Sequence, residues 1–161
     1  MSPSTRFVFV SPVLPWPPDQ GARRFQLEAA RALREIGPVT WVTRPVGRQP
    51  DAERRLRAEG FDLDLDRGFE ARDPVRRLVR RLRTDLAARR RDEPREIHFV
   101  SSPGVRERVR RLGREHPGAW FVGAYWTTAR ALEAAPAGRR VLLAADVESH
   151  ALARAGAMDA E

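Results

Sequence analysis

The chain has 161 residues, of which 42% are hydrophobic, and this length suits one domain with a real core but not two domains of ordinary size. It contains no cysteine, which excludes disulfides, thiolate nucleophiles and cysteine-based metal sites. All 30 basic residues are arginine and the formal net charge is +8. This charge suits an anionic partner, but the absence of lysine makes a GC-rich genome the simpler explanation.

Apolar runs and segments of helical periodicity alternate along the chain. In chain order they predict a strand at 7–10, a helix at 22–35, a strand at 39–43, a short helix near 51–59, an edge strand or loop at 61–66, a helix at 74–91, a helix at 104–115, a strand at 120–124, a short helix near 127–134, a strand at 141–145 and the start of a further helix. Asp73 is the expected N-cap of the helix that begins at Pro74.

Three of these helices carry an apolar stripe that we expect to face the core. The stripes are Phe25, Ala29, Ala32, Leu33 and Ile36 in the first helix, Val75, Leu78, Val79, Leu82 and Leu86 in the helix after Asp73, and Val105, Val109 and Leu112 in the next. Strands separated by helices favour parallel pairing with right-handed crossovers. The expected fold is therefore α/β, a Rossmann-like doubly wound and mostly parallel sheet of about four or five strands, with helices on both faces.

Unusual residues follow three of the predicted strands. In sheets of this kind ligands bind beyond the carboxyl ends of the strands. The segments that leave those ends are 11–21, 125–127 and 146–150, and the first contains four prolines and Trp16. We expect all three segments to line one rim.

The first of these segments ends where a helix begins, at Gly21. A helix N-terminus offers unpaired N–H groups and partial positive charge to an anion. Arg23 and Arg24 follow in the first turn, where their charge opposes the helix dipole unless an anion is present. The segment has no GxGxxG pattern, so it is not a dinucleotide fingerprint.

Each of these residues also has a structural interpretation. Gly21 could be a turn glycine, Trp16 could pack on the surface of its own domain, and Tyr125 and Trp126 could form the inner wall of the core. Asp146 could be an N-cap with Glu148 in the first turn, and His150 one more helical residue. His98 and His116 belong to no recognisable constellation.

The alternating segment FDLDLD at 61–66 contains two Asp-x-Asp pairs. Its apolar residues alternate with its acids, so we expect Asp62, Asp64 and Asp66 on the solvent face of an edge strand, where charge discourages aggregation. We expect no metal site.

Three stretches, PWPPDQGARRFQLEAARAL, IHFVSSPGVRERVRRL and RRVLLAADVESHALAR, resemble the N-terminal domain of family 4 glycosyltransferases, which have the GT-B fold. The third is similar to a segment of one bacterial branch. The resemblance covers nearly the whole chain in the right order. It implies an acceptor-side domain, a nucleotide-sugar donor as co-substrate, a carbohydrate or lipid-linked acceptor, and no other cofactor.

The resemblance also implies roles for particular residues. It places the donor diphosphate near Gly21, Ala22 and Arg24, although alanine stands where the family usually has a second glycine. For a domain that receives the acceptor, we expect Trp16, Tyr125 and Trp126, on the expected rim, to contact the acceptor. The catalytic wall of the cleft falls to Asp146, Glu148 and His150, although many members have a histidine at the start of that segment.

In the family a second Rossmann-like domain binds the donor, and residues 1–161 contain no such unit. The chain is therefore expected to be an N-terminal fragment, a truncated product or one half of a split enzyme. Alone, it is expected to be inactive.

The rival class is a non-catalytic binding module. Residues 72–95 hold ten arginines and four acids, and residues 106–115 hold five and two. These segments lack aromatic residues and a recognition helix, which disfavours nucleic acid; an anionic membrane surface suits them better, although burial of the leucine stripe in the core is the simpler assignment.

Two features bear on the compartment. No apolar run approaches the roughly 18 residues that span a bilayer. The opening MSPSTR leads into the first strand without a secretory leader. We therefore expect a cytoplasmic protein, peripheral at the inner membrane surface if the basic helix docks there.

Overall fold

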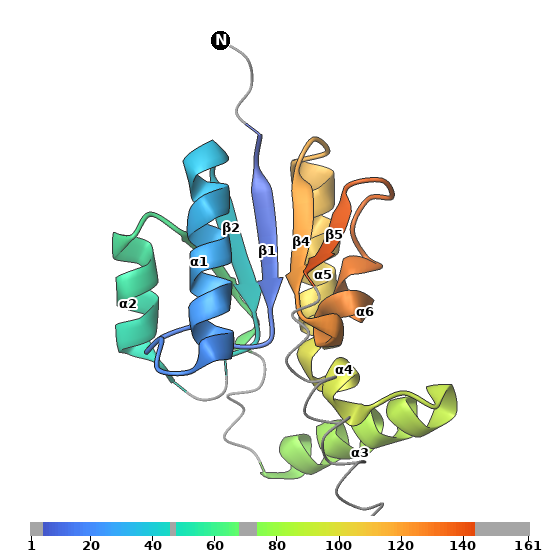
Figure 1. Cartoon of the computed structure of the whole chain (residues 1–161). Coiled ribbons are helices and arrows are strands. Elements are labelled where there is room, and N and C mark those ends of the chain that lie inside the picture. Colours follow the sequence, from blue (N-terminus) through green and yellow to red (C-terminus); the bar gives the residue numbers. More distant parts are fainter. Residues whose placement is uncertain (1–4, 46–47, 68–73, 144–161) are drawn as a thin grey trace, which may run out of the picture.

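The computed structural model describes residues 5–45, 48–67 and 74–143. The elements, in order, are β1 Phe7–Ser11, α1 Gly21–Ile36, β2 Val39–Thr43, α2 Pro50–Ala58, β3 Asp62–Leu65, α3 Pro74–Arg91, α4 Arg95–Val100, α5 Pro103–Glu115, β4 Trp120–Ala124, the 3-10 turn η2 Trp126–Thr128, α6 Ala129–Leu132 and β5 Arg140–Leu143 (Figure 1). All the predicted elements that fall within the described residues are present, and α4 is an addition. The helix expected after Asp146 lies outside the described residues.

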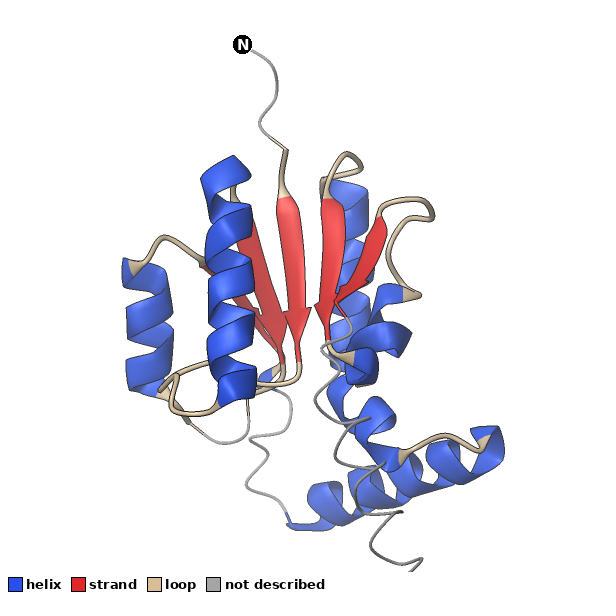
Figure 2. Ribbon diagram, viewed as in Figure 1, coloured by secondary structure: helices blue, strands red, loops and turns tan. Residues whose placement is uncertain are grey.

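The strands form one 5-stranded sheet in the order β3-β2-β1-β4-β5, and every neighbouring pair is parallel (Figure 2). The chain moves outward from β1 to β3 and then crosses to the other side of β1. The topological switch point, where ligands of such sheets usually bind, therefore lies between β1 and β4. The fold is the predicted Rossmann-like α/β fold, and β3 lies at an edge of the sheet, as one of the two alternatives for 61–66 predicted.

Helices cover both faces of the sheet, which explains why β1 reads as an uninterrupted apolar run. Phe7 and Phe9 face α1 and α2, whereas Val8 and Val10 face α5 and α6. On the α5 side, Val105, Val109 and Leu112 are buried as their spacing predicted. Among the described residues, no helix combines the length and apolar character required to cross a membrane.

The face of α1 that packs on the sheet differs from the predicted stripe. The buried residues are Gln26, Leu27 and Ala30, whereas Phe25 and Ile36 are exposed. Phe25 instead meets the ring of Tyr125 edge-on, with centroids 6.2 Å apart. The buried face of α1 is thus rotated about the helix axis relative to the predicted one. Prediction from the largest apolar side chains gives too little weight to Leu27 and Ala30.

The core assignment of the α3 stripe was wrong. Leu78 and Leu82 are 58% and 59% exposed, and Val79 and Leu86 are exposed too. The helix lies beyond the carboxyl ends of the strands and packs on α4 (Figure 1). Because α1, α2, α5 and α6 already cover the sheet, the stripe of α3 has no sheet surface to pack on.

Candidate functional site

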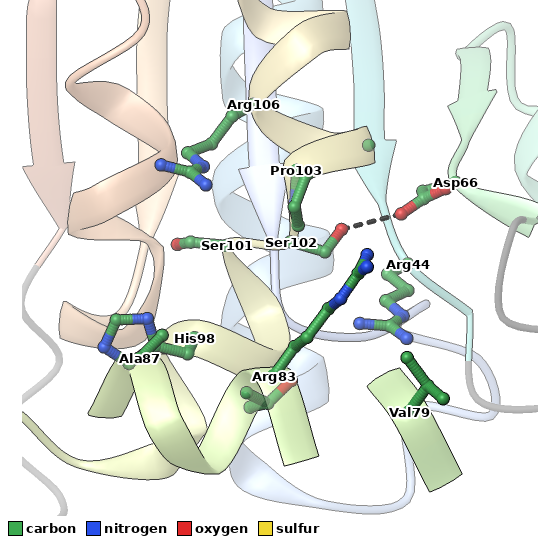
Figure 3. Close-up of a pocket in the computed structure, with 12 residues that line it drawn as sticks. Arg44, Asp66, Val79, Arg83, Ala87, His98, Ser101, Ser102, Pro103 and Arg106 are labelled. Atoms are coloured by element: carbon green, nitrogen blue, oxygen red, sulfur yellow. Dashed lines mark hydrogen bonds between the residues drawn. The ribbon is translucent and has the colours of Figure 1, made fainter. Parts of the chain in front are cut away.

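A cavity of about 530 Å³ lies at the carboxyl edge of the sheet. Its lining comes from the residues that follow β2 and β3, from α3 and α4, and from the start of α5 (Figure 3). The volume falls within the range of small-molecule sites, roughly 300–1,000 Å³. Of the site residues proposed from the sequence, those that the structure describes do not line this cavity; they are Trp16, Gly21, Ala22, Arg24, Tyr125 and Trp126.

One wall is built around the carboxylate of Asp66, which lies against the start of α5. Ser102 is the N-cap: its Oγ accepts a hydrogen bond from the backbone N–H of Val105 and donates one of 2.6 Å to Oδ2 of Asp66 (Figure 3). A Cβ at Gly104 would lie 2.5 Å from both carboxylate oxygens. Glycine is therefore what lets the carboxylate approach the helix N-terminus, where negative charge is favourable.

The aspartates of the segment 61–66 are not all on the solvent face, which corrects the sequence interpretation. Asp62 is exposed, but Nε of Arg108 lies 3.1 Å from Oδ1 of Asp64, and Asp66 is buried and paired with the same arginine. Arg111 also contacts Asp64, at 2.5 Å. Arginines of α5 thus neutralise Asp64 and Asp66. The described residues contain no group of three or more potential ligands that could hold a metal ion.

The other charged groups of the lining are Arg44, Arg83 and Arg106. Arg44 is 3% exposed, donates from a terminal nitrogen to the carbonyl of Phe99 at 3.1 Å, and lies 4.7 Å from the centroid of that ring. The Nε of Arg106 is buried without a hydrogen-bond partner among the described residues. Three arginines against one already paired aspartate make the cavity electropositive, which suits an anionic ligand.

A further wall carries His98, to which the sequence gave no role. Its Nε2 lies 2.9 Å from Oε2 of Glu93, and Glu93 also accepts hydrogen bonds from Arg130. Those bonds from Arg130 hold the pKa of the Glu93 carboxyl below its usual value. The network links α4 and the residue Glu93 before it to Arg130 of α6. It therefore holds in place the helix on which α3 packs.

Tyr125 follows β4 at the switch point, and its backbone is strained. Its φ of 71° with ψ of 154° is a conformation that residues other than glycine rarely adopt. Its N–H donates to the carbonyl of Leu143, and its own carbonyl accepts from the N–H and the hydroxyl of Thr128. Strain held in place at a strand end is a feature of functional sites.

The aromatic side chains proposed for acceptor contact are placed differently from one another. Tyr125 is buried in the core on the α1 side, so its ring forms the inner wall of the core, one of the two alternatives left open. Trp16 is half-buried against the same core, and the guanidinium of Arg55 lies 5.5 Å from the centre of its ring. Trp126 is half-buried in η2.

The residues proposed for the donor diphosphate lie at the start of α1. Gly21, Ala22 and Arg24 are all exposed, and a Cβ at Gly21 would meet no atom within 4 Å. Gln20, the N-cap, makes no side-chain capping bond. The proposed catalytic residues Asp146, Glu148 and His150 lie outside the described residues.

Sequence reasoning missed the whole cavity lining, although two signals were present. Ser102-Pro103 is an N-cap followed by proline in the first turn, which places the start of α5. Arg44 directly follows a buried strand, a position from which a side chain reaches the carboxyl edge. No signal in the sequence brings these two residues together.

The chain was compared with protein-family models, with curated proteins and with solved structures, and none of them matched.

Proposed function

We propose that this chain is the acceptor-side, N-terminal domain of a nucleotide-sugar glycosyltransferase, one half of a GT-B fold. The observation that carries the proposal is the arginine-rich cavity beyond the carboxyl ends of an all-parallel sheet. The resemblance noted in the sequence supports it, since the strand, proline-rich loop and helix that it implies correspond to β1, residues 12–20 and α1.

The cavity is the proposed acceptor site. Arg44, Arg83 and Arg106 favour an acceptor that carries phosphate or carboxylate, because arginine pairs with both through charge-assisted hydrogen bonds. Val79 and Ala87 add apolar surface to the same lining. An acceptor with a charged group and an apolar part fits this combination.

The proposed reaction needs a second, donor-binding domain, in the same polypeptide or in a partner. The bond between the anomeric carbon and the donor diphosphate breaks, a bond from that carbon to an acceptor hydroxyl oxygen forms, and the hydroxyl proton passes to a base. Asp146, Glu148 and His150 are the proposed candidates for that base, by resemblance alone. The open start of α1 at Gly21 supports an approach to the diphosphate from this domain.

Calorimetry on the chain tests the assignment of the domain. Uridine and guanosine diphosphate sugars should show no micromolar binding, because the donor-binding domain supplies that recognition. A simple sugar phosphate should bind. When the chain is first saturated with the sugar phosphate and then titrated with a nucleotide sugar, micromolar binding should again be absent. Micromolar binding of either nucleotide sugar would show that the domain is misassigned.

A further inference from the structure

Helix α3 exposes a row of large apolar side chains to solvent. Leu78, Val79, Leu82 and Leu86 recur at helical spacing and are all exposed. Elsewhere in the described residues, large exposed apolar side chains occur singly in α1 or as a pair in β5. A contiguous apolar patch of this kind marks an interaction surface.

The arginines of α3 whose side chains the structure describes differ in their pairing from those of α5. Eight of its 18 residues are arginine and one is acidic. On α5, Arg108, Arg110, Arg111 and Arg114 all pair with carboxylates. On α3, by contrast, the exposed residues Arg83, Arg89 and Arg90 make no ion pair with any residue that the structure describes. The described arginines of the two helices therefore differ in whether a carboxylate pairs with them.

The packing of α3 leaves the apolar row accessible. The helix contacts α4, and Ala88 of α3 is buried. Val79, Arg83 and Ala87 of α3 point toward the cavity (Figure 3). Leu78, Leu82 and Leu86 follow one another at intervals of four residues, so they form a separate ridge beside the residues of the cavity. Figure 1 shows α3 at one extremity of the described chain, beyond the carboxyl ends of the strands.

The apolar ridge and the arginines beside it restrict the kind of partner that can contact both. A nucleic acid would use the arginines but not the leucines, and an acidic protein surface would leave the leucines in water. The surface of an anionic bilayer accepts both, since leucines enter the boundary between headgroups and acyl chains while guanidinium groups stay among the phosphates. We propose that α3 docks this chain on an anionic bilayer, with the helix axis in the plane of the headgroups.

Docking in this orientation brings the cavity close to the bilayer, because α3 supplies both surfaces. Arg83 and Val79 line the cavity, and Leu82 lies between them in the sequence on the neighbouring ridge. The inference does not rest on glycosyl transfer: a chain that docks and has no transferase function satisfies it. If transfer is also correct, a ligand anchored in the bilayer could reach the cavity.

Sedimentation with vesicles tests the docking. The full chain is spun with sucrose-loaded vesicles of phosphatidylcholine alone, or of an equal mixture of phosphatidylcholine and phosphatidylglycerol, at low and at high salt. We expect binding to the mixed vesicles only, weakened by salt because screening reduces the contribution of the arginines. Binding to both kinds of vesicle alike, or to neither, overturns the proposal.

Two pairs of variants assign the binding to α3. The double variant Leu82→Gln/Leu86→Gln should lower the partition coefficient by at least about tenfold, whereas Ile36→Gln, an exposed apolar position on α1, should not change it. Arg89→Gln/Arg90→Gln should lower it by about fivefold for each arginine. Arg110→Gln/Arg114→Gln on α5, where carboxylates already pair with the arginines, should have little effect.

The variants also separate a bilayer from a second copy of the chain as the occupant. All the substituted side chains on α3 are exposed, so circular dichroism spectra should match that of the unchanged protein. Light scattering should give the same mass for the unchanged chain and for Leu82→Gln/Leu86→Gln. A dimer that this double variant converts to a monomer would overturn the proposal, as would equal losses of vesicle binding in the α3 and α5 arginine variants.

Discussion

The hydroxyl of Ser102 joins the end of β3 to the start of α5, because its Oγ donates to Oδ2 of Asp66 at 2.6 Å while accepting from the backbone of α5. This pair shapes one wall of the cavity and brings a carboxylate to a helix N-terminus. Ser102→Ala removes both bonds and leaves a buried carboxylate with one partner fewer. We expect a loss of about 2 kcal/mol in the free energy of unfolding, measured with urea.

A double-mutant cycle shows whether that loss belongs to the pair. Asp66→Asn, Ser102→Ala and the double variant are unfolded under the same conditions, so that the separate contact of Asp66 with Arg108 cancels. Coupling of about 1 kcal/mol is expected. Strictly additive losses would mean that the two side chains do not interact in solution.

The arginines of the cavity should bind anions more strongly than the other arginines of the same helix. Arg83 lines the cavity and Arg90 does not, although both are exposed on α3. Arg83→Gln should weaken the binding of glucose 1-phosphate about tenfold, as expected for the loss of a charge-assisted hydrogen bond, and Arg90→Gln should leave it nearly unchanged. Calorimetry provides the comparison; equal losses would remove the cavity as the anion site.

Because the backbone at Tyr125 is strained, we expect Tyr125→Gly to be more stable than Tyr125→Ala. Both Tyr125→Ala and Tyr125→Gly lose the buried ring, but only glycine adopts a φ of 71° at little cost. The glycine variant should be more stable than the alanine variant by about 1 kcal/mol in urea unfolding, the reverse of the usual order within regular elements. An alanine variant at least as stable would show that the backbone is relaxed at this position.

The sequence predicts the sheet well and the cavity poorly. β1, β2 and β4 are buried on both faces, and the apolar run of FVFV, for example, is the pattern that such burial requires. The cavity depends on pairs such as Ser102 with Asp66, which lie 36 residues apart in the sequence. The alternation of acids in β3 was consistent with exposure and with pairing alike, so local pattern could not decide between them.

The same limit explains the error at α3. Amphipathic periodicity says which side chains share a face of a helix but not whether another element covers that face. Leu82 and Val109 have similar neighbours in the sequence, yet Val109 packs on the sheet and Leu82 meets solvent. The difference arises because four other helices already cover the two faces of the sheet, so no sheet surface is left for α3.

Acid should weaken the contacts around Glu93. Its folded-state pKa is lowered, chiefly by the hydrogen bond from Arg130, so the unfolded chain binds more protons there as pH falls. The contribution of Glu93 to stability is therefore present above the unfolded carboxyl pKa, about 4.3, and is lost as pH drops through the lower folded value. Urea midpoints between neutral and strongly acid pH should fall less steeply for Glu93→Gln than for the unchanged chain. An equally steep fall would mean that the bond between Glu93 and Arg130 does not form in solution.

Sugar transfer is the most direct test of the proposed function. The test needs a donor-binding domain with a glycine-rich turn and paired glutamates as its second component, and we propose to seek it in the DNA around the codon for Glu161. Release of nucleoside diphosphate should require this chain, that domain and an anionic acceptor together, and Arg83→Gln should reduce it while Arg90→Gln does not. The proposal is contradicted if no such domain is encoded there, or if the combined protein binds a nucleotide sugar and transfers it to none of the anionic acceptors offered.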